Sequence, residues 1–110
     1  MNSRKIRSDE KKLIEIILAE LDDKNISFLD TGEVQEIDSE GSIKFVRDHD
    51  SLSQKYLPVE AEFMDSDGVH VHAMVFVIDN MVDELEIYKS DGSPILHKPQ
   101  PEDWTILNLA

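Results

Sequence analysis

The sequence predicts an α+β fold, in which one N-terminal amphipathic helix packs on an antiparallel meander sheet of about five strands. Between Val59 and Lys89, apolar side chains fall on alternate positions in three successive segments, which is the period of a strand with one buried face. Near the N-terminus, apolar residues recur instead at intervals of three and four, the period of a helix. A chain of 110 residues has the length of a single domain.

The helix is expected to follow a basic stretch. Residues 1–7 are predicted to form a flexible lead, and Ser8 is suited to the N-cap of a helix. Apolar residues then recur at helical spacing as far as Leu21, so the helix should have roughly four turns. Asn25 is suited to its C-terminal end. The side chains expected to pack on the inner face of the sheet are Ile14, Ile17 and Leu21.

Turn chemistry predicts how the first two long strands pair. If Phe63 pairs with Val71, the loop between the strands has three residues, 66–68, and Gly68 stands last. Such a loop needs a left-handed residue at that position, which glycine adopts without a Cβ clash. Because side chains alternate between faces, a slip by one residue would expose the whole apolar set. The register of this hairpin should therefore be well specified.

Two further hairpins follow from the same reasoning. One is expected to pair Val77 with Leu85 and Val75 with Ile87 around a loop from Asp79 to Asp83. The other joins residues 34–37 to 42–46 around a turn that ends in Gly41. The side chains that this second hairpin should add to the core are Ile37, Ile43 and Phe45.

The C-terminal part is predicted to be an extended tail over residues 94–110 that packs on the body of the domain. Three prolines, at positions 94, 99 and 101, disfavour regular structure there. Trp104 begins an apolar terminus, and a ring of this size is expected to be buried against the domain.

The net charge of −13 is distributed unevenly along the chain. Residues 1–12 hold five of the 11 basic residues and two of the 24 acidic ones, so the remainder has six basic against 22 acidic residues, a net charge of −16. Such a field repels nucleic acid and anionic membrane surfaces, because both are bound through Lys and Arg. It favours a cationic partner.

The outer face of the predicted sheet mixes acidic and apolar side chains, which is where we expect a partner to bind. Carboxylates steer association with basic partners, and aromatic or apolar side chains supply the contact energy. The predicted cross-strand neighbours on this face are Glu62 with His72, Met74 with Tyr88, and Phe76 with Glu86. The predicted partner-binding residues are Glu60, Glu62, Asp65, Asp67, His70, His72, Asp83, Glu84, Glu86 and Tyr88.

No set of residues in the sequence has the spacing of a catalytic site, and we expect the protein not to be an enzyme. The chain has no cysteine, which excludes disulfides and thiolate chemistry. The segment from Asp65 to Gly68 begins like a calcium loop, but position twelve of such a loop would be Phe76 where glutamate is needed. We therefore predict no metal and no cofactor.

The helix over residues 10–21, the hairpin Asp38-Ser39-Glu40-Gly41-Ser42-Ile43-Lys44-Phe45, and the run Asp67-Gly68-Val69-His70-Val71 continuing to Asp91 resemble a small bacterial family of acidic α+β domains. The resemblance covers about residues 10–92. In size and charge the chain is also similar to immunity proteins of contact-dependent growth-inhibition systems. That similarity implies a protein that neutralises a basic toxin domain, often a nuclease. The sequence has no apolar run near the length of a membrane span, and residues 1–7 lack the apolar core of a signal peptide, so we expect a cytoplasmic protein.

Two alternatives remain open from the sequence. Two imidazoles and a carboxylate are ordinary metal ligands, so His70, His72 and Glu62 could serve a small-ligand or metal-binding domain. The apolar half of the outer face could instead join two copies in a homodimeric adaptor. The expectation is a monomer or weak dimer when no partner is present.

Overall fold

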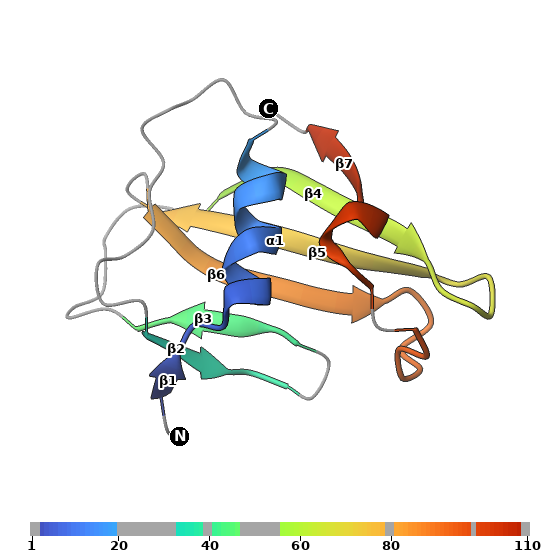
Figure 1. The fold of residues 1–110 in the computed structure, drawn as a ribbon, viewed down its shortest axis with the longest axis horizontal. Helices are drawn as coiled ribbons and strands as arrows, with labels where there is room; N and C mark the ends of the chain where they lie inside the picture. Colours follow the sequence, from blue (N-terminus) through green and yellow to red (C-terminus); the bar gives the residue numbers. More distant parts are fainter. Residues whose placement is uncertain are drawn as a thin grey trace.

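The described residues of the chain form a seven-stranded antiparallel sheet with one α-helix on one side of it (Figure 1). The computed structural model describes residues 3–19, 33–38, 41–46, 56–78, 81–97 and 99–108. In the described part, the strands are β1 (Ser3–Lys5), β2 (Glu33–Glu36), β3 (Ile43–Phe45), β4 (Tyr56–Met64), β5 (His70–Ile78), β6 (Met81–Lys89) and β7 (Thr105–Asn108). Their order across the sheet is β1-β2-β3-β6-β5-β4-β7. The helices are α1 (Ser8–Leu18) and the short 3₁₀ helix η1 (Pro101–Asp103).

The α+β class is confirmed, but the described residues form seven strands and not about five. The two additional strands lie at the edges of the sheet. β1 forms where a flexible lead was expected and pairs with β2, while β7 forms within the predicted extended tail and pairs with β4. Each has only three or four residues, which is too short to show an alternation of apolar and polar side chains in the sequence.

The first long hairpin has the predicted register. Phe63 pairs with Val71, and Gly68 has a φ of 82°, in the left-handed region. The Asp65 N–H donates to the Val69 carbonyl across the turn at 3.0 Å.

The predicted register of the second hairpin was wrong by two residues. Val75 pairs with Leu85, and β6 already begins at Met81, inside the segment expected to be loop. Asp83 is the extra residue of a β-bulge, because it lies between Val82, which pairs with Val77, and the next paired residue of β6. The bulge brings two successive buried residues to β6, which a strict alternation cannot predict.

The β2–β3 hairpin contributes Ile43 and Phe45 to the core as predicted, but Ile37 is 46% exposed. Ile37 follows the last residue of β2, and its N–H donates to the Ser42 carbonyl in the turn. Its side chain therefore lies outside the buried face.

Helix α1 packs against the sheet through Ile14 and Ile17, which are fully buried as expected. The third predicted contact, Leu21, and the predicted helix end at Asn25 lie outside the described residues. The N-cap is Arg7 and not Ser8. The Arg7 N–H donates to the Glu10 carboxylate at 2.8 Å, which satisfies a backbone donor at the helix start.

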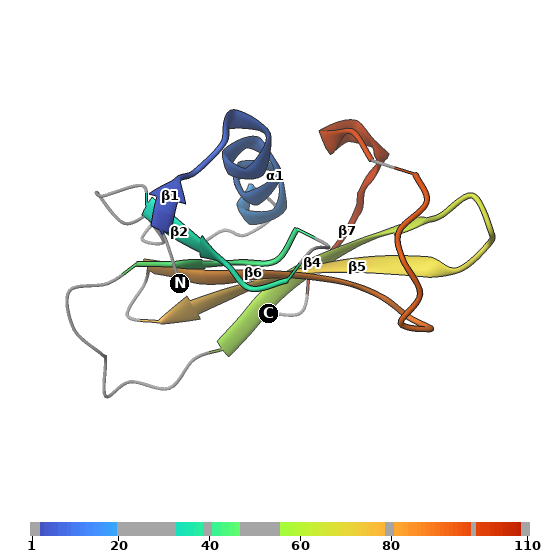
Figure 2. The ribbon, with the colours of Figure 1, turned by 90° about the horizontal axis from the view of Figure 1, so that it is seen from below.

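The core lies between α1, η1 and one face of the sheet (Figure 2). Trp104 belongs to it, with 8% of its surface exposed and its ring edge-to-face with Phe63 at a centroid distance of 4.8 Å. The buried apolar residues are Leu13, Ile14, Ile17, Val34, Ile43, Phe45, Val59, Ala61, Phe63, Val71, Ala73, Val75, Val77, Val82, Leu85 and Trp104. In the part of the chain that the structure describes, no helix is long and apolar enough to cross a membrane.

Candidate functional site

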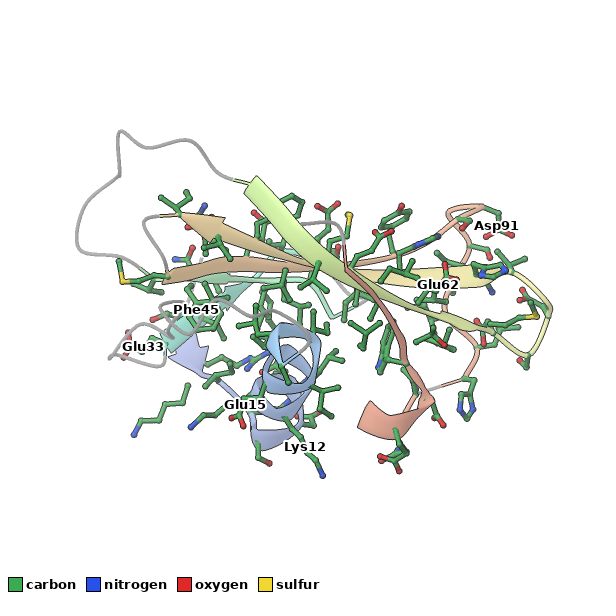
Figure 3. The ribbon with its side chains drawn as sticks, turned by 90° about the horizontal axis from the view of Figure 1, so that it is seen from above. Lys12, Glu15, Glu33, Phe45, Glu62 and Asp91 are labelled. Atoms are coloured by element: carbon green, nitrogen blue, oxygen red, sulfur yellow. The ribbon has the colours of Figure 1, made fainter. Side chains whose placement is uncertain are left out.

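The candidate site is the face of the sheet opposite α1, which we call the outer face. Both described helices lie on the other side of the sheet (Figure 2), and Lys12 and Glu15 of α1 point away from it (Figure 3). Side chains on the outer face of β4, β5 and β6 are half-buried or exposed, in alternation with the buried core positions. This is a sheet face packed on the core on one side and open, among described residues, on the other.

One cross-strand row on the outer face gathers the two histidines around one carboxylate. Glu62 pairs with His72, which in turn pairs with Tyr88. The Glu62 Oε2 atom lies 3.7 Å from Nδ1 of His70 and 4.0 Å from Nδ1 of His72. The His72 ring stacks on Tyr88 with a centroid distance of 4.8 Å and an interplanar angle of 17°.

The two nitrogens of the His72 ring have different surroundings. Nε2 lies 3.0 Å from the Ser90 hydroxyl, within hydrogen-bonding distance. Nδ1 is buried and, among described residues, makes no hydrogen bond, with Glu62 as its nearest ionic neighbour. Stacking on Tyr88 and contact with Ser90 therefore fix the position of the His72 ring.

The neighbouring row places an apolar side chain between two carboxylates. Met74 pairs with Glu60 on one side and Glu86 on the other, where the predicted register had placed Tyr88 opposite Met74. Within the described residues, neither glutamate takes part in an ion pair. Both carboxylates are half-buried beside the Met74 side chain, so they are fixed by the sheet and accessible to a cationic group.

A third row continues across the sheet to β3. Phe76 pairs with Glu84, and not with Glu86 as predicted, and Glu84 pairs with Lys44. Lys44 is a basic side chain on this face that sequence reasoning missed. Its position between two core residues of β3, Ile43 and Phe45, was the signal that could have placed it outward.

Of the ten predicted partner-binding residues, seven are half-buried or exposed on the outer face and three are not. The seven are Glu60, Glu62, His70, His72, Glu84, Glu86 and Tyr88. Asp83 is buried in the β-bulge, with 1% of its surface exposed, and receives the Lys44 ammonium at 3.3 Å. Asp65 is buried at the end of the β4–β5 hairpin, and Asp67 lies in its turn.

Asp65 and Asp67 form ion pairs with a buried lysine, Lys89. Lys89 Nζ lies 3.0 Å from Asp65 Oδ2 and 2.6 Å from Asp67 Oδ2. Lys89 pairs with Val71, a core residue, so this ionic group lies on the side of α1. These two aspartates hold the fold together at the hairpin and are not part of the outer face.

The arrangement of Glu62, His70 and His72 does not fit a metal ion. Among the residues that the structure describes, no three histidine or acidic side chains are placed to hold one. The outer face instead presents carboxylates, imidazoles and the Tyr88 ring on one surface of the sheet.

The sequence was also compared with known proteins. No curated protein and no solved structure matches the chain. A family model described as "Domain of unknown function (DUF6984)" matches residues 3–99, which include α1 and strands β1 to β6. Because the match covers most of its length, the chain belongs to this family.

Proposed function

We propose that the protein binds a basic protein partner through the outer face of its sheet. The observation that carries this proposal is the row in which Met74 lies between Glu60 and Glu86. An apolar contact flanked by two fixed carboxylates suits a Lys or Arg side chain, whose aliphatic stem covers apolar surface while its charge reaches an acidic group.

The adjoining row extends the same surface. Tyr88 is 40% exposed and stacks on His72, so it offers an aromatic ring held in place by a neighbour. Ordered aromatic side chains of this kind are enriched among residues that dominate binding energy. The net charge of −13 adds long-range attraction for a basic protein and speeds its association.

The specific form that we propose is neutralisation of a basic toxin domain, in the manner of an immunity protein. Carboxylates would take the places of substrate phosphates on the toxin's cationic surface and block access to it. This form rests on charge and on the composition of the outer face, and it needs no catalytic residue.

The experiment is capture of a partner from the source cells by tagged protein, at low and high salt, with the natural chain and two charge-reversal variants. Glu86→Lys changes the outer face. Glu15→Lys makes the same change in net charge on the exposed surface of α1, facing away from the sheet. The expected result is one stoichiometric basic partner, lost at high salt and in Glu86→Lys but retained in Glu15→Lys.

Two other results would overturn the proposal. Equal loss of capture in both variants would mean that net charge, and not the outer face, is responsible. Absence of a partner together with concentration-dependent mass in analytical ultracentrifugation would assign the face to contact between two copies of the chain.

A further inference from the structure

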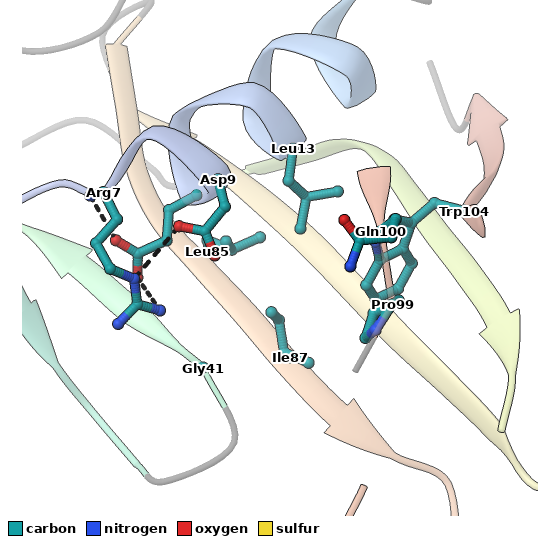
Figure 4. Close-up of a pocket in the computed structure, with 10 residues that line it drawn as sticks. Arg7, Asp9, Leu13, Gly41, Leu85, Ile87, Pro99, Gln100 and Trp104 are labelled. Atoms are coloured by element: carbon teal, nitrogen blue, oxygen red, sulfur yellow. Dashed lines mark hydrogen bonds and ion pairs between the residues drawn. The ribbon is translucent and has the colours of Figure 1, made fainter. Parts of the chain in front are cut away.

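A pocket of about 280 Å³ lies on the side of the sheet that carries α1 (Figure 4). It lies between the start of α1, the turn of the β2–β3 hairpin, strand β6 and the segment before β7. The residues that line it are Arg7, Asp9, Glu10, Leu13, Gly41, Leu85, Ile87, Pro99, Gln100 and Trp104. None of them belongs to the outer face, so the pocket is independent of the proposed partner-binding surface.

The floor and one wall of the pocket are apolar. Leu85 and Ile87 of β6 form the floor, and Leu13 of α1 lies above them (Figure 4). Trp104 and Pro99 form the wall opposite the start of α1. Since Trp104 also packs edge-to-face on Phe63, its indole is fixed in position and presents a rigid apolar surface to the pocket.

The charged side chains of the polar wall are ion-paired. Arg4 donates two hydrogen bonds to the Glu10 carboxylate, at 2.9 and 2.8 Å, so the charge of Glu10 is compensated. Arg7 Nε lies 3.3 Å from Asp9 Oδ1 at the exposed rim. Arg7 Nη2 also lies 3.5 Å from Glu10 Oε2, and Arg4 Nε pairs with Glu36 at 2.8 Å. The two carboxylates that line the pocket, and the Arg7 guanidinium beside them, are therefore already engaged in ion pairs.

A third polar group faces this wall across the pocket. The backbone N–H of Gln100 is engaged with Asp103 at 2.8 Å, whereas its side-chain amide lines the pocket and offers both a donor and an acceptor. A ligand with an apolar body and a small polar end could therefore place its polar end between Gln100 and the Arg7–Asp9 pair.

We propose that this pocket binds a small molecule with one aromatic ring and a neutral or zwitterionic polar group. The volume is close to the lower end of small-molecule sites, roughly 300 Å³, and too small for a helix or strand of a partner. The ring would lie on Leu85 and Ile87 against Trp104. Because the charged side chains of the polar wall are already ion-paired, they favour a polar group without net charge over an anion or a cation.

Trp104 supplies a direct signal for occupancy, because it is the single tryptophan of the chain. We would record the indole N–H resonance in ¹H–¹⁵N spectra of the full chain during titration with four probes that share one ring. They are benzyl alcohol, phenylalanine, phenylacetate and benzylamine. The expected result is a saturable shift of the Trp104 resonance with the first two probes and weaker binding of the two charged ones.

Two matched variants test the location. Ile87→Phe fills the floor of the pocket, whereas Ile78→Phe makes the same substitution on the outer face. We expect Ile87→Phe to weaken benzyl alcohol binding by roughly tenfold or more and Ile78→Phe to leave it unchanged. If Ile87→Phe does not fold, nuclear Overhauser contacts from bound benzyl alcohol to Leu13 and Trp104 in the natural chain provide the same test.

Three results would overturn the inference. They are no saturable shift of Trp104 with any probe, equal binding in Ile87→Phe and the natural chain, and contacts of the bound probe that lie on the outer face. A preference for phenylacetate or benzylamine would contradict the proposed ligand class.

Discussion

Lys89 Nζ lies 3.0 Å from Asp65 Oδ2, and both side chains are almost completely buried. The same carboxylate accepts the backbone N–H groups of Leu96 and His97, at 2.8 and 2.9 Å. One buried ion pair therefore joins the β4–β5 hairpin, the end of β6 and the segment that leads to the C-terminal strand. Burial acts to raise the pKa of Asp65, but the hydrogen bonds from the Leu96 N–H and the Lys89 ammonium outweigh it and hold this pKa well below its usual range.

This pKa predicts how stability depends on pH. A carboxyl group whose pKa is lower in the folded state stabilises the fold fully above its unfolded pKa, about 3.9, and loses that contribution as the pH falls further. We expect the melting temperature to fall on acidification below about pH 4. Asp65→Asn should melt several degrees lower than the natural chain at pH 7. Its melting temperature should then fall less on acidification than that of the natural chain.

The measurement is thermal unfolding followed by circular dichroism at pH 7, 5 and 3. The control is Glu102→Gln, which removes an exposed carboxyl group in η1 and should behave like the natural chain. If Asp65→Asn and the natural chain lose equal stability between pH 5 and 3, the ion pair is not the source of the acid sensitivity.

The Ser42 hydroxyl hydrogen-bonds to the backbone of β6, as the backbone of a neighbouring strand would. Its removal should therefore destabilise the fold. The hydroxyl accepts the Ile87 N–H at 2.8 Å and donates to the Ile87 carbonyl at 3.1 Å, while only 1% of the residue is exposed. Ser42→Ala would leave both backbone groups without these partners, at a cost of roughly 1–3 kcal/mol. Ser66→Ala, at an exposed turn position, should cost less than about 0.5 kcal/mol.

Urea unfolding of both serine variants checks this prediction. Equal midpoints for Ser42→Ala and Ser66→Ala would mean that solvent or a shift of β3 satisfies the Ile87 groups.

The sequence was sufficient to predict the elements with strong periodicity. Alternation over β4 and β5, together with a glycine at the left-handed position of the turn, predicted both strands and their register. The apolar spacing of α1 predicted which residues of the helix face the core. In each case the local pattern and the tertiary contacts agree, so the pattern alone was informative.

The remaining features depend on contacts between distant parts of the chain. Asp83 interrupts the alternation of β6 because it is the unpaired residue of a bulge, and Asp65 is buried because Lys89 neutralises it there. Strands β1 and β7 are held by the backbones of their neighbours. None of these features has a local signature in the sequence. For this reason two buried aspartates were predicted to lie on the surface, and the two edge strands were not predicted.

The turn glycines offer a test of backbone conformation. Gly41 and Gly68 both have positive φ, at 108° and 82°. A Cβ at Gly41 would also lie 3.3 Å from Ile87 Cδ1, whereas at Gly68 it would meet no atom within 4 Å. Gly68→Ala should therefore cost only the left-handed conformation, roughly 1–2 kcal/mol, and Gly41→Ala should cost more.

Unfolding midpoints of the two alanine variants, measured side by side in urea, give the comparison. A Gly41→Ala variant as stable as Gly68→Ala would show that the hairpin and Ile87 adjust to the added methyl group without cost.

Trp104 lies beyond residues 3–99, the range that the family model matches, yet the structure predicts that it is essential to the stability of this domain. Its ring is buried beside Phe63, and the strand that follows it pairs with the centre of β4. Trp104→Ala should cost about 3–5 kcal/mol, because it leaves a cavity in the core. Trp104→Phe, which keeps an aromatic ring there, should cost less.

Ile37→Ala is the matched control for this prediction, since it removes an apolar side chain that is 46% exposed and outside the core. The measurement is urea unfolding followed by circular dichroism, which does not depend on the tryptophan. If Trp104→Ala lost no more stability than Ile37→Ala, the C-terminal segment would not be needed for the stability of the domain. The expected larger loss would instead mean that the folding unit extends past the residues by which the family is recognised.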